Sequence, residues 1–187
     1  MSRDVVISGV GLATAFGDTE RSLAAWRAGQ SAILHHSLPD APEFPRFAAG
    51  IGLAHEPLVD HRSAVRPYLQ QRKLLKYMNQ TALLAVLAAG RALEAAQLLS
   101  ADESDDQMGL YMTCGLIAFD LSEVLRFVET AVAADGSIDY LRMGSEGLRA
   151  CHPLMPFKML LNMPLGLVSI NYRIRGENGI YYRGPLQ

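Results

Sequence analysis

The chain has 187 residues, of which 50% are hydrophobic and 19% are charged, and its formal net charge at pH 7 is −2. This composition is typical of a protein with a sizeable core and excludes a disordered chain. The absence of a basic surplus argues against a nucleic-acid-binding protein. The longest apolar run, 82–89, is too short to cross a bilayer, which takes about 20 residues.

The start of the chain and its cysteines bear on location and cofactors. Met1 leads directly into a strand-like pattern without the apolar region of a secretory signal, so we expect the protein in the cytoplasm. Cys114 and Cys151 lie far apart and predict two buried free thiols, because a structural zinc site needs four ligands. Adjacent His35 and His36 point apart in a strand and so do not predict a shared metal. We therefore expect no metal and no cofactor.

Three elements are predicted in the first third of the chain. Asp4–Gly11 predicts a buried strand, because β-branched residues run together and glycines end the run. Asp18 is a good N-cap for a helix that Gly29 closes. Residues 31–67 are rich in proline and weakly periodic, which indicates an irregular excursion with a short strand near Phe47–Leu53.

The remaining elements alternate between helix and strand. Arg72–Leu99 predicts a long helix that is apolar on every face in its middle, as in a helix buried on all sides; a partner-binding helix is the alternative. Met108–Cys114 predicts a buried strand, and residues 120–134 and 138–151 predict two helical pieces. Leu167–Arg173 fits either a strand or a late helix. This alternation favours a layered α/β fold.

Glycines follow the first predicted strand in a pattern that has two interpretations. Gly9 and Gly11 suit a dinucleotide-binding loop, but Thr14 stands where that loop has its third glycine. Without this glycine the next helix cannot pack closely on the strand, so we predict no NAD site. The pattern Gly9, Gly11, Thr14 and Gly17 instead resembles the opening of the β-ketoacyl synthases, a strand followed by Gly-x-Gly-x-x-Thr-x-x-Gly.

Further stretches resemble the same family, in order and over nearly the whole chain. They are the Trp26 helix with its turn at 28–31, the helix stretch 91–96, the strand 108–115, the motif residues Asn162, Met163 and Gly166, and the turn at Arg175–Gly176. The resemblance is to the N-terminal half of the family. It implies a thiolase-like layered α/β fold, present as a mixed sheet with covering helices, in a single domain over residues 1–187.

The family resemblance also implies a chemistry, from which this chain departs. Members usually work as dimers and use a cysteine thiolate to accept an acyl group from an acyl carrier protein. Counting without gaps from Asn162 places the nucleophile position on Pro185, which has no nucleophile. The family's catalytic histidines belong to its second half, and His152 matches neither. We therefore assign no catalytic residue.

Two positions are carried over from the family's acyl tunnel. They fall on Leu116 and Met155, and both side chains are apolar, as a tunnel wall requires. The residue at the second position often reaches the tunnel from the dimer partner in this family. Ordinary core side chains are the alternative for both.

Three functions follow as hypotheses. The first is a catalytically incomplete ketosynthase-like subunit, similar to a chain-length factor, that associates with a ketosynthase or an acyl carrier protein in fatty-acid or polyketide elongation. The second is the N-terminal piece of an active β-ketoacyl synthase that needs its C-terminal half. The third is a degenerate module that binds a carrier protein or a subunit. All three imply a homodimer or a heterodimer, without nucleic acid and without a membrane span.

Overall fold

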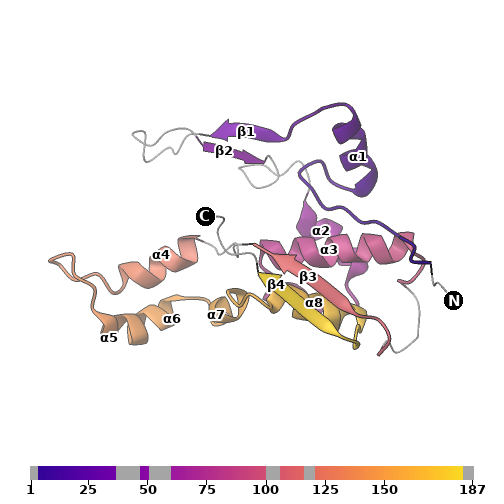
Figure 1. Ribbon diagram of the computed structural model, residues 1–187. Helices are drawn as coiled ribbons and strands as arrows, with labels where there is room; N and C mark the ends of the chain where they lie inside the picture. The colour runs from indigo at the N-terminus through magenta and orange to yellow at the C-terminus, as the bar shows by residue number, and fades with distance from the viewer. Residues whose placement is uncertain (1–3, 37–46, 51–59, 100–105, 116–120, 183–187) are drawn as a thin grey trace. The chain divides into compact units, whose positions relative to one another are not determined.

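The computed structural model describes residues 4–36, 47–50, 60–99, 106–115 and 121–182 (Figure 1). The chain divides into two compact units, the first formed by residues 1–72 and 83–104 and the second by residues 73–82 and 105–187. The helix α3 (Gln80–Ala95) begins in the second unit and continues into the first. Among the described residues, no helix is long and apolar enough to cross a membrane.

The first unit contains the helix α1 (Thr19–Arg27), which has the predicted boundaries. The side chain of Asp18 accepts a hydrogen bond from the backbone N–H of Arg21 at 2.9 Å, as an N-cap does. The chain leaves α1 at Gly29, whose φ is 65°, a left-handed conformation that favours glycine. Local signals thus determine both ends of α1.

The proline-rich excursion contains a hairpin and short helical turns. Strand β1 (Ile33–His36) pairs antiparallel with β2 (Phe47–Gly50), with Ile33 opposite Gly50. The short strand expected near Phe47–Leu53 is confirmed as β2, and residues 51–53 lie outside the described part. The helix α2 (His61–Ala64) and the 3₁₀ turn η1 (Arg66–Tyr68) follow.

The prediction of a buried first strand at Asp4–Gly11 is wrong. Residues 4–11 form no strand, and the side chains of Val5 and Ile7 are 96% and 87% exposed. A strand needs the ladder hydrogen bonds of a neighbour, and the described strands pair only with one another. The β-branched run therefore shows strand propensity without a paired strand.

The prediction of one helix over Arg72–Leu99 is also wrong in its extent. Residues Arg72–Tyr77 form the 3₁₀ helix η2, and α3 starts only at Gln80. The side chain of Asn79 accepts a hydrogen bond from the N–H of Ala82 at 2.8 Å, so Asn79 is an N-cap inside the expected helix. One face of the middle of α3 is buried, with Val86 and Leu87 at 0% exposure, but Leu84 and Ala88 are half-buried, so burial on all sides is not observed.

The second unit is built on a parallel strand pair. Strand β3 (Leu110–Cys114) pairs with β4 (Asn178–Tyr182), from Leu110 opposite Asn178 to Cys114 opposite Tyr182. The helix α8 (Met163–Tyr172) contacts both strands and buries Leu167 and Val168 (Figure 1). The segment Leu167–Arg173 is thus helical, and Arg173 ends α8 in a left-handed conformation. The strand predicted at Met108–Cys114 is observed as β3, but the prediction that it is buried is wrong, since Cys114 is its one buried residue and Tyr111 is 56% exposed.

A helical segment lies between these two strands in the sequence. It contains α4 (Leu121–Glu129), α5 (Tyr140–Arg142), the π-helical turn η3 (Met143–Gly147), α6 (Leu148–Ala150) and α7 (Met155–Lys158). The second predicted helical piece is confirmed as α5 to α6. The first ends at Glu129 rather than at residue 134, and the Thr130 hydroxyl that follows it donates to the carbonyl of Phe127 at 2.8 Å.

Candidate functional site

The loop Leu12–Gly17 brings together two residues of the opening motif. The backbone N–H of Thr14 donates to the carbonyl of Gly17 at 3.2 Å, and the N–H of Gly17 donates to the carbonyl of Thr14 at 3.0 Å. Gly17 has a φ of 113°, which only glycine adopts without strain. These two motif positions are therefore needed for the shape of the loop.

The side chain of Thr14 joins this loop to α1. Its hydroxyl lies 2.6 Å from the hydroxyl of Ser22, and Ser22 donates to the carbonyl of Asp18 at 2.6 Å. Because the single hydroxyl proton of Ser22 is used in this way, Thr14 donates to Ser22. The Thr14 oxygen also accepts from the N–H of Phe16 at 3.1 Å. Thr14 thus has a structural role here.

His61 holds the same loop from α2. Its Nε2 lies 2.9 Å from the carbonyl oxygen of Thr14, and its side chain is buried. A carbonyl oxygen can only accept, so Nε2 carries the proton and cannot serve as a base at that position. Sequence reasoning placed His61 in the excursion without a partner, because 47 positions separate it from Thr14.

Arg91 of α3 also holds the loop Leu12–Gly17, through hydrogen bonds to two of its carbonyls. Its Nη1 donates to the carbonyl of Leu12 at 2.5 Å and to the carbonyl of Gly17 at 2.9 Å. Charge-assisted hydrogen bonds of this kind are stronger than neutral ones. The backbone of Gly9 and Gly11 packs against the same helix, where a Cβ on Gly11 would lie 2.9 Å from the Cβ of Arg91.

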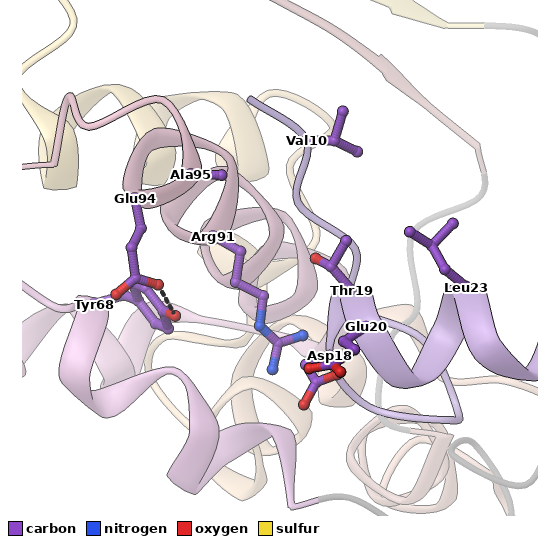
Figure 2. A pocket seen from close by; sticks show the side chains of 9 residues that line it. All are labelled: Val10, Asp18, Thr19, Glu20, Leu23, Tyr68, Arg91, Glu94 and Ala95. Carbon is purple, nitrogen blue, oxygen red and sulfur yellow. Dashed lines mark hydrogen bonds between the residues drawn. The ribbon is translucent and has the colours of Figure 1, made fainter. Parts of the chain in front are cut away.

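An open pocket of about 510 Å³ lies beside Arg91 in the first unit (Figure 2). It is lined by Val10, Asp18, Thr19, Glu20, Leu23, Tyr68, Arg91, Glu94 and Ala95. The hydroxyl of Tyr68 donates to Glu94 Oε2 at 2.7 Å. Burial, together with this bond and the charge of Glu94, raises the pKa of Tyr68 above 10.0. Tyr68 therefore stays protonated at neutral pH and acts as a hydrogen-bond donor.

The pocket lining combines ionisable and apolar side chains. Three carboxylates, Asp18, Glu20 and Glu94, surround apolar side chains, and the lining contains no thiol and no histidine. Sequence reasoning missed the pocket because Tyr68 and Glu94 are 26 positions apart and no local pattern pairs them.

The two acyl-tunnel candidates have different outcomes. Met155 begins α7 and is 8% exposed, which suits either a tunnel wall or a core position. Leu116 lies outside the described residues. The assignment of both residues to a tunnel therefore stays a prediction.

The other motif residues lie at the ends and on the surface of α8 and beside β4. Asn162 precedes α8 and its carbonyl accepts from the N–H of Gly166 at 2.9 Å, while Met163 opens the helix. A Cβ on Gly166 would meet no atom within 4 Å. Gly176 lies against the backbone of Asp106 and Met108, and its N–H donates to the carbonyl of Met108 at 3.1 Å. Gly176 therefore permits a close approach that a side chain would block.

The two cysteines are buried, as the sequence predicts. Cys114 and Cys151 form no disulfide and are buried, and burial limits the access of reagents to a thiol. Within the described ranges, no group of three or more His, Cys, Asp or Glu side chains is placed to hold a metal ion. Pro185, on which the ungapped count from Asn162 places the nucleophile position, lies outside the described residues.

The fold is similar to that of a solved β-ketoacyl synthase from Burkholderia phymatum STM815. The TM-score is 0.61 at 19% sequence identity, and the match covers 95% of this chain. It covers 38% of that chain, so the present chain spans well under half the length of this protein. No protein-family model and no curated protein matches the sequence.

This likeness defines the class of fold. Helices that accompany a small parallel sheet, arranged as in a β-ketoacyl synthase, give a ketosynthase-like α/β fold that is compatible with the expected thiolase-like architecture. At 19% identity the likeness extends to the fold alone.

Proposed function

We propose that this chain is a ketosynthase-like subunit, a single N-terminal-like domain, that acts by association with a ketosynthase or an acyl carrier protein in fatty-acid or polyketide elongation. The observation that carries the proposal is the fold likeness over 95% of the chain. A role without its own catalysis is supported by the burial of both thiols, since a thiolate that accepts acyl groups has to be accessible.

Exposed apolar side chains in both units support association. In the first unit Val5 and Ile7 are 96% and 87% exposed, and in the second Tyr140 and Leu141 are 75% and 83% exposed. Exposed apolar surface is unfavourable by about 25 cal/mol per Å², so large patches of it mark interaction surfaces. We propose that a ketosynthase subunit or a second copy of the chain covers part of this surface.

A basic stretch supports binding of an acidic partner such as a carrier protein. Between His61 and Leu93 the sequence contains no Asp or Glu. Arg62, Arg66 and Arg72 are exposed in this stretch, and within the described residues none of them forms an ion pair. Unpaired surface cations steer an acidic partner and weaken at high salt.

The proposal is tested by titrating labelled acyl carrier protein with the full chain and measuring fluorescence anisotropy. We expect saturable binding that weakens with salt and that falls about tenfold on the double change Arg62→Glu and Arg72→Glu. Arg149→Glu, which changes an exposed charge on α6, is the control and should leave the affinity unchanged. The proposal is wrong if neither carrier protein nor a ketosynthase binds.

A second candidate is the N-terminal piece of an active β-ketoacyl synthase. The observation that favours it is the coverage of only 38% of the similar synthase chain. Adding a separately produced C-terminal half of a ketosynthase and assaying condensation of malonyl carrier protein separates the two candidates. Activity in the mixture supports the second candidate. Carrier binding that does not depend on the acyl chain, without condensation, supports a simple binding module.

We also propose that Met155 and Leu116 line an acyl tunnel in the complex with the partner. The burial of Met155 at the start of α7 and its flexible apolar side chain support this role.

A further inference from the structure

One amide side chain in the second unit bonds to two helices at once. Asn79 Oδ1 accepts from the N–H of Ala82 in the first turn of α3 at 2.8 Å. Its Nδ2 donates to the carbonyl of Lys158, the last residue of α7, at 2.8 Å. Both bonds are partly buried. The bond to Lys158 joins residues that lie 79 positions apart in the sequence.

These two bonds satisfy backbone groups that helix ends leave unpaired. Ala82 is the third residue of α3, so its N–H has no partner within the helix, and the carbonyl of Lys158 has none within α7. Asparagine carries an acceptor and a donor on one planar group, whereas aspartate offers acceptors only. The residue type at position 79 therefore matters for α7 and not only for α3.

The helix α7 depends on such an anchor. It has four residues, which are too few for a stable isolated helix. The side chain of Phe157 within it is 53% exposed and so adds little packing. Met155 is the residue of α7 that is buried, with 8% exposure. The packing of Met155 at one end and the bond from Asn79 at the other hold the helix in place.

We propose that Asn79 is a latch that fixes α7 to the start of α3 and thereby positions Met155. The latch itself follows from the two hydrogen bonds. Its role in setting the wall of an acyl tunnel rests on the proposed function of Met155.

The peptide bond after Lys158 gives a direct measurement of the latch. Trypsin cleaves between Lys158 and Met159, and it has to bind the carbonyl of Lys158 that Asn79 holds. Cleavage therefore requires release of this bond, and its rate follows the population of the released state when opening is fast.

We expect the variant Asn79→Asp to be cut at this bond about fivefold to tenfold faster than the wild type, because aspartate still caps α3 but cannot donate to Lys158. Cleavage after the exposed Arg149 serves as the internal control and should keep its rate. Asn79→Ala loses both bonds and should show faster cleavage together with a lower unfolding midpoint. An unchanged rate after Lys158 in Asn79→Asp, with the mass of the fragments confirming the site, overturns the latch.

A second measurement distinguishes the latch from the proposed acyl tunnel. It follows the binding of a fluorescent acyl chain to the complex of this chain with its partner. Weaker acyl binding in Asn79→Asp, at unchanged affinity for the partner, supports the positioning of Met155. Faster cleavage without any acyl binding by the wild type leaves the latch standing and overturns the tunnel of the proposed function.

Discussion

At the scale of single residues, hydrogen bonds from two distant side chains of the first unit converge on backbone carbonyls of the loop Leu12–Gly17. Arg91 reaches two of them from positions 79 and 74 residues away, and His61 reaches a third across 47 residues. Backbone carbonyls that are withdrawn from water need partners, and these side chains supply them, which is a structural role. The identity of the residues does not reveal this role, because arginine and histidine also occur in active sites.

Tyr68 leads to a prediction on pH. Burial and Glu94 raise its pKa above 10.0, so the folded chain holds this proton more tightly than the unfolded chain. Its contribution to stability is complete below about pH 10 and is lost as the pH rises through the folded pKa. We expect the stability difference between the wild type and Tyr68→Phe to stay constant below about pH 10 and to shrink as the pH rises above it, as measured by urea unfolding midpoints.

The variant Glu94→Gln is the matched control for this measurement. It removes the charge that raises the pKa of Tyr68 but keeps a hydrogen-bond acceptor. The pH dependence of the stability of Glu94→Gln should therefore lie between that of the wild type and that of Tyr68→Phe. Parallel curves for the wild type and Tyr68→Phe would show that the raised pKa is wrong.

At the scale of elements, the ends of helices can be predicted from neighbouring residues, whereas the contacts between helices cannot. Asp18 and Gly29 limit α1 at the places that the sequence predicts. Asn79 divides the predicted helix Arg72–Leu99 because its side chain finds a backbone N–H of α3 and a carbonyl of α7. The bond to Ala82 is a local N-cap signal, but the partner on α7 is distant in the sequence, so this second contact could not be predicted from the residues around Asn79.

Two glycines give a matched prediction at this scale. A Cβ on Gly11 would collide with the backbone of Ala88 and Ala92 in α3, so we expect Gly11→Ala to lower the free energy of unfolding by about 3 kcal/mol. Gly166, inside α8, has no atom within 4 Å of a Cβ, so Gly166→Ala should raise it by about 0.5–1 kcal/mol. Denaturant unfolding measures both, and an equal loss in the two variants would contradict the packing of Gly11 on α3.

At the scale of the whole molecule, the chain has a ketosynthase-like fold and exposes large apolar side chains to solvent. The similar synthase is much longer than this chain, which covers 38% of it. Each unit has its own buried residues, such as Val65 in the first and Val168 in the second, yet each also exposes β-branched or aromatic residues. Such surface favours association over an isolated state.

This surface gives a prediction for the isolated chain. We expect size-exclusion chromatography with light scattering to show a mass that rises with concentration up to about 100 µM. The double change Val5→Thr and Ile7→Thr should reduce the association with little effect on stability, because both side chains are almost fully exposed. A monomer at all concentrations, with sharp thermal unfolding, would contradict dependence on a partner.

The amino-acid sequence alone determined the class of fold, the limits of α1, the position of β3 and the approximate place of the hairpin strand β2. These features depend on neighbours within a few positions, such as caps, glycine turns and runs of β-branched residues. The order of the motifs along the chain also led to the ketosynthase likeness, which the fold comparison supports over 95% of the chain.

Only the tertiary structure decided the roles of Asn79, Tyr68 and Arg91, and the absence of a strand at Asp4–Gly11. Each of these outcomes depends on a group far away in the sequence: a carbonyl of α7, a carboxylate of α3, the carbonyls of the first loop, or a neighbouring strand that the described part does not supply. Hydrogen-bond partners and strand neighbours are selected by the folded arrangement of the chain, and local propensity carries no information about that selection.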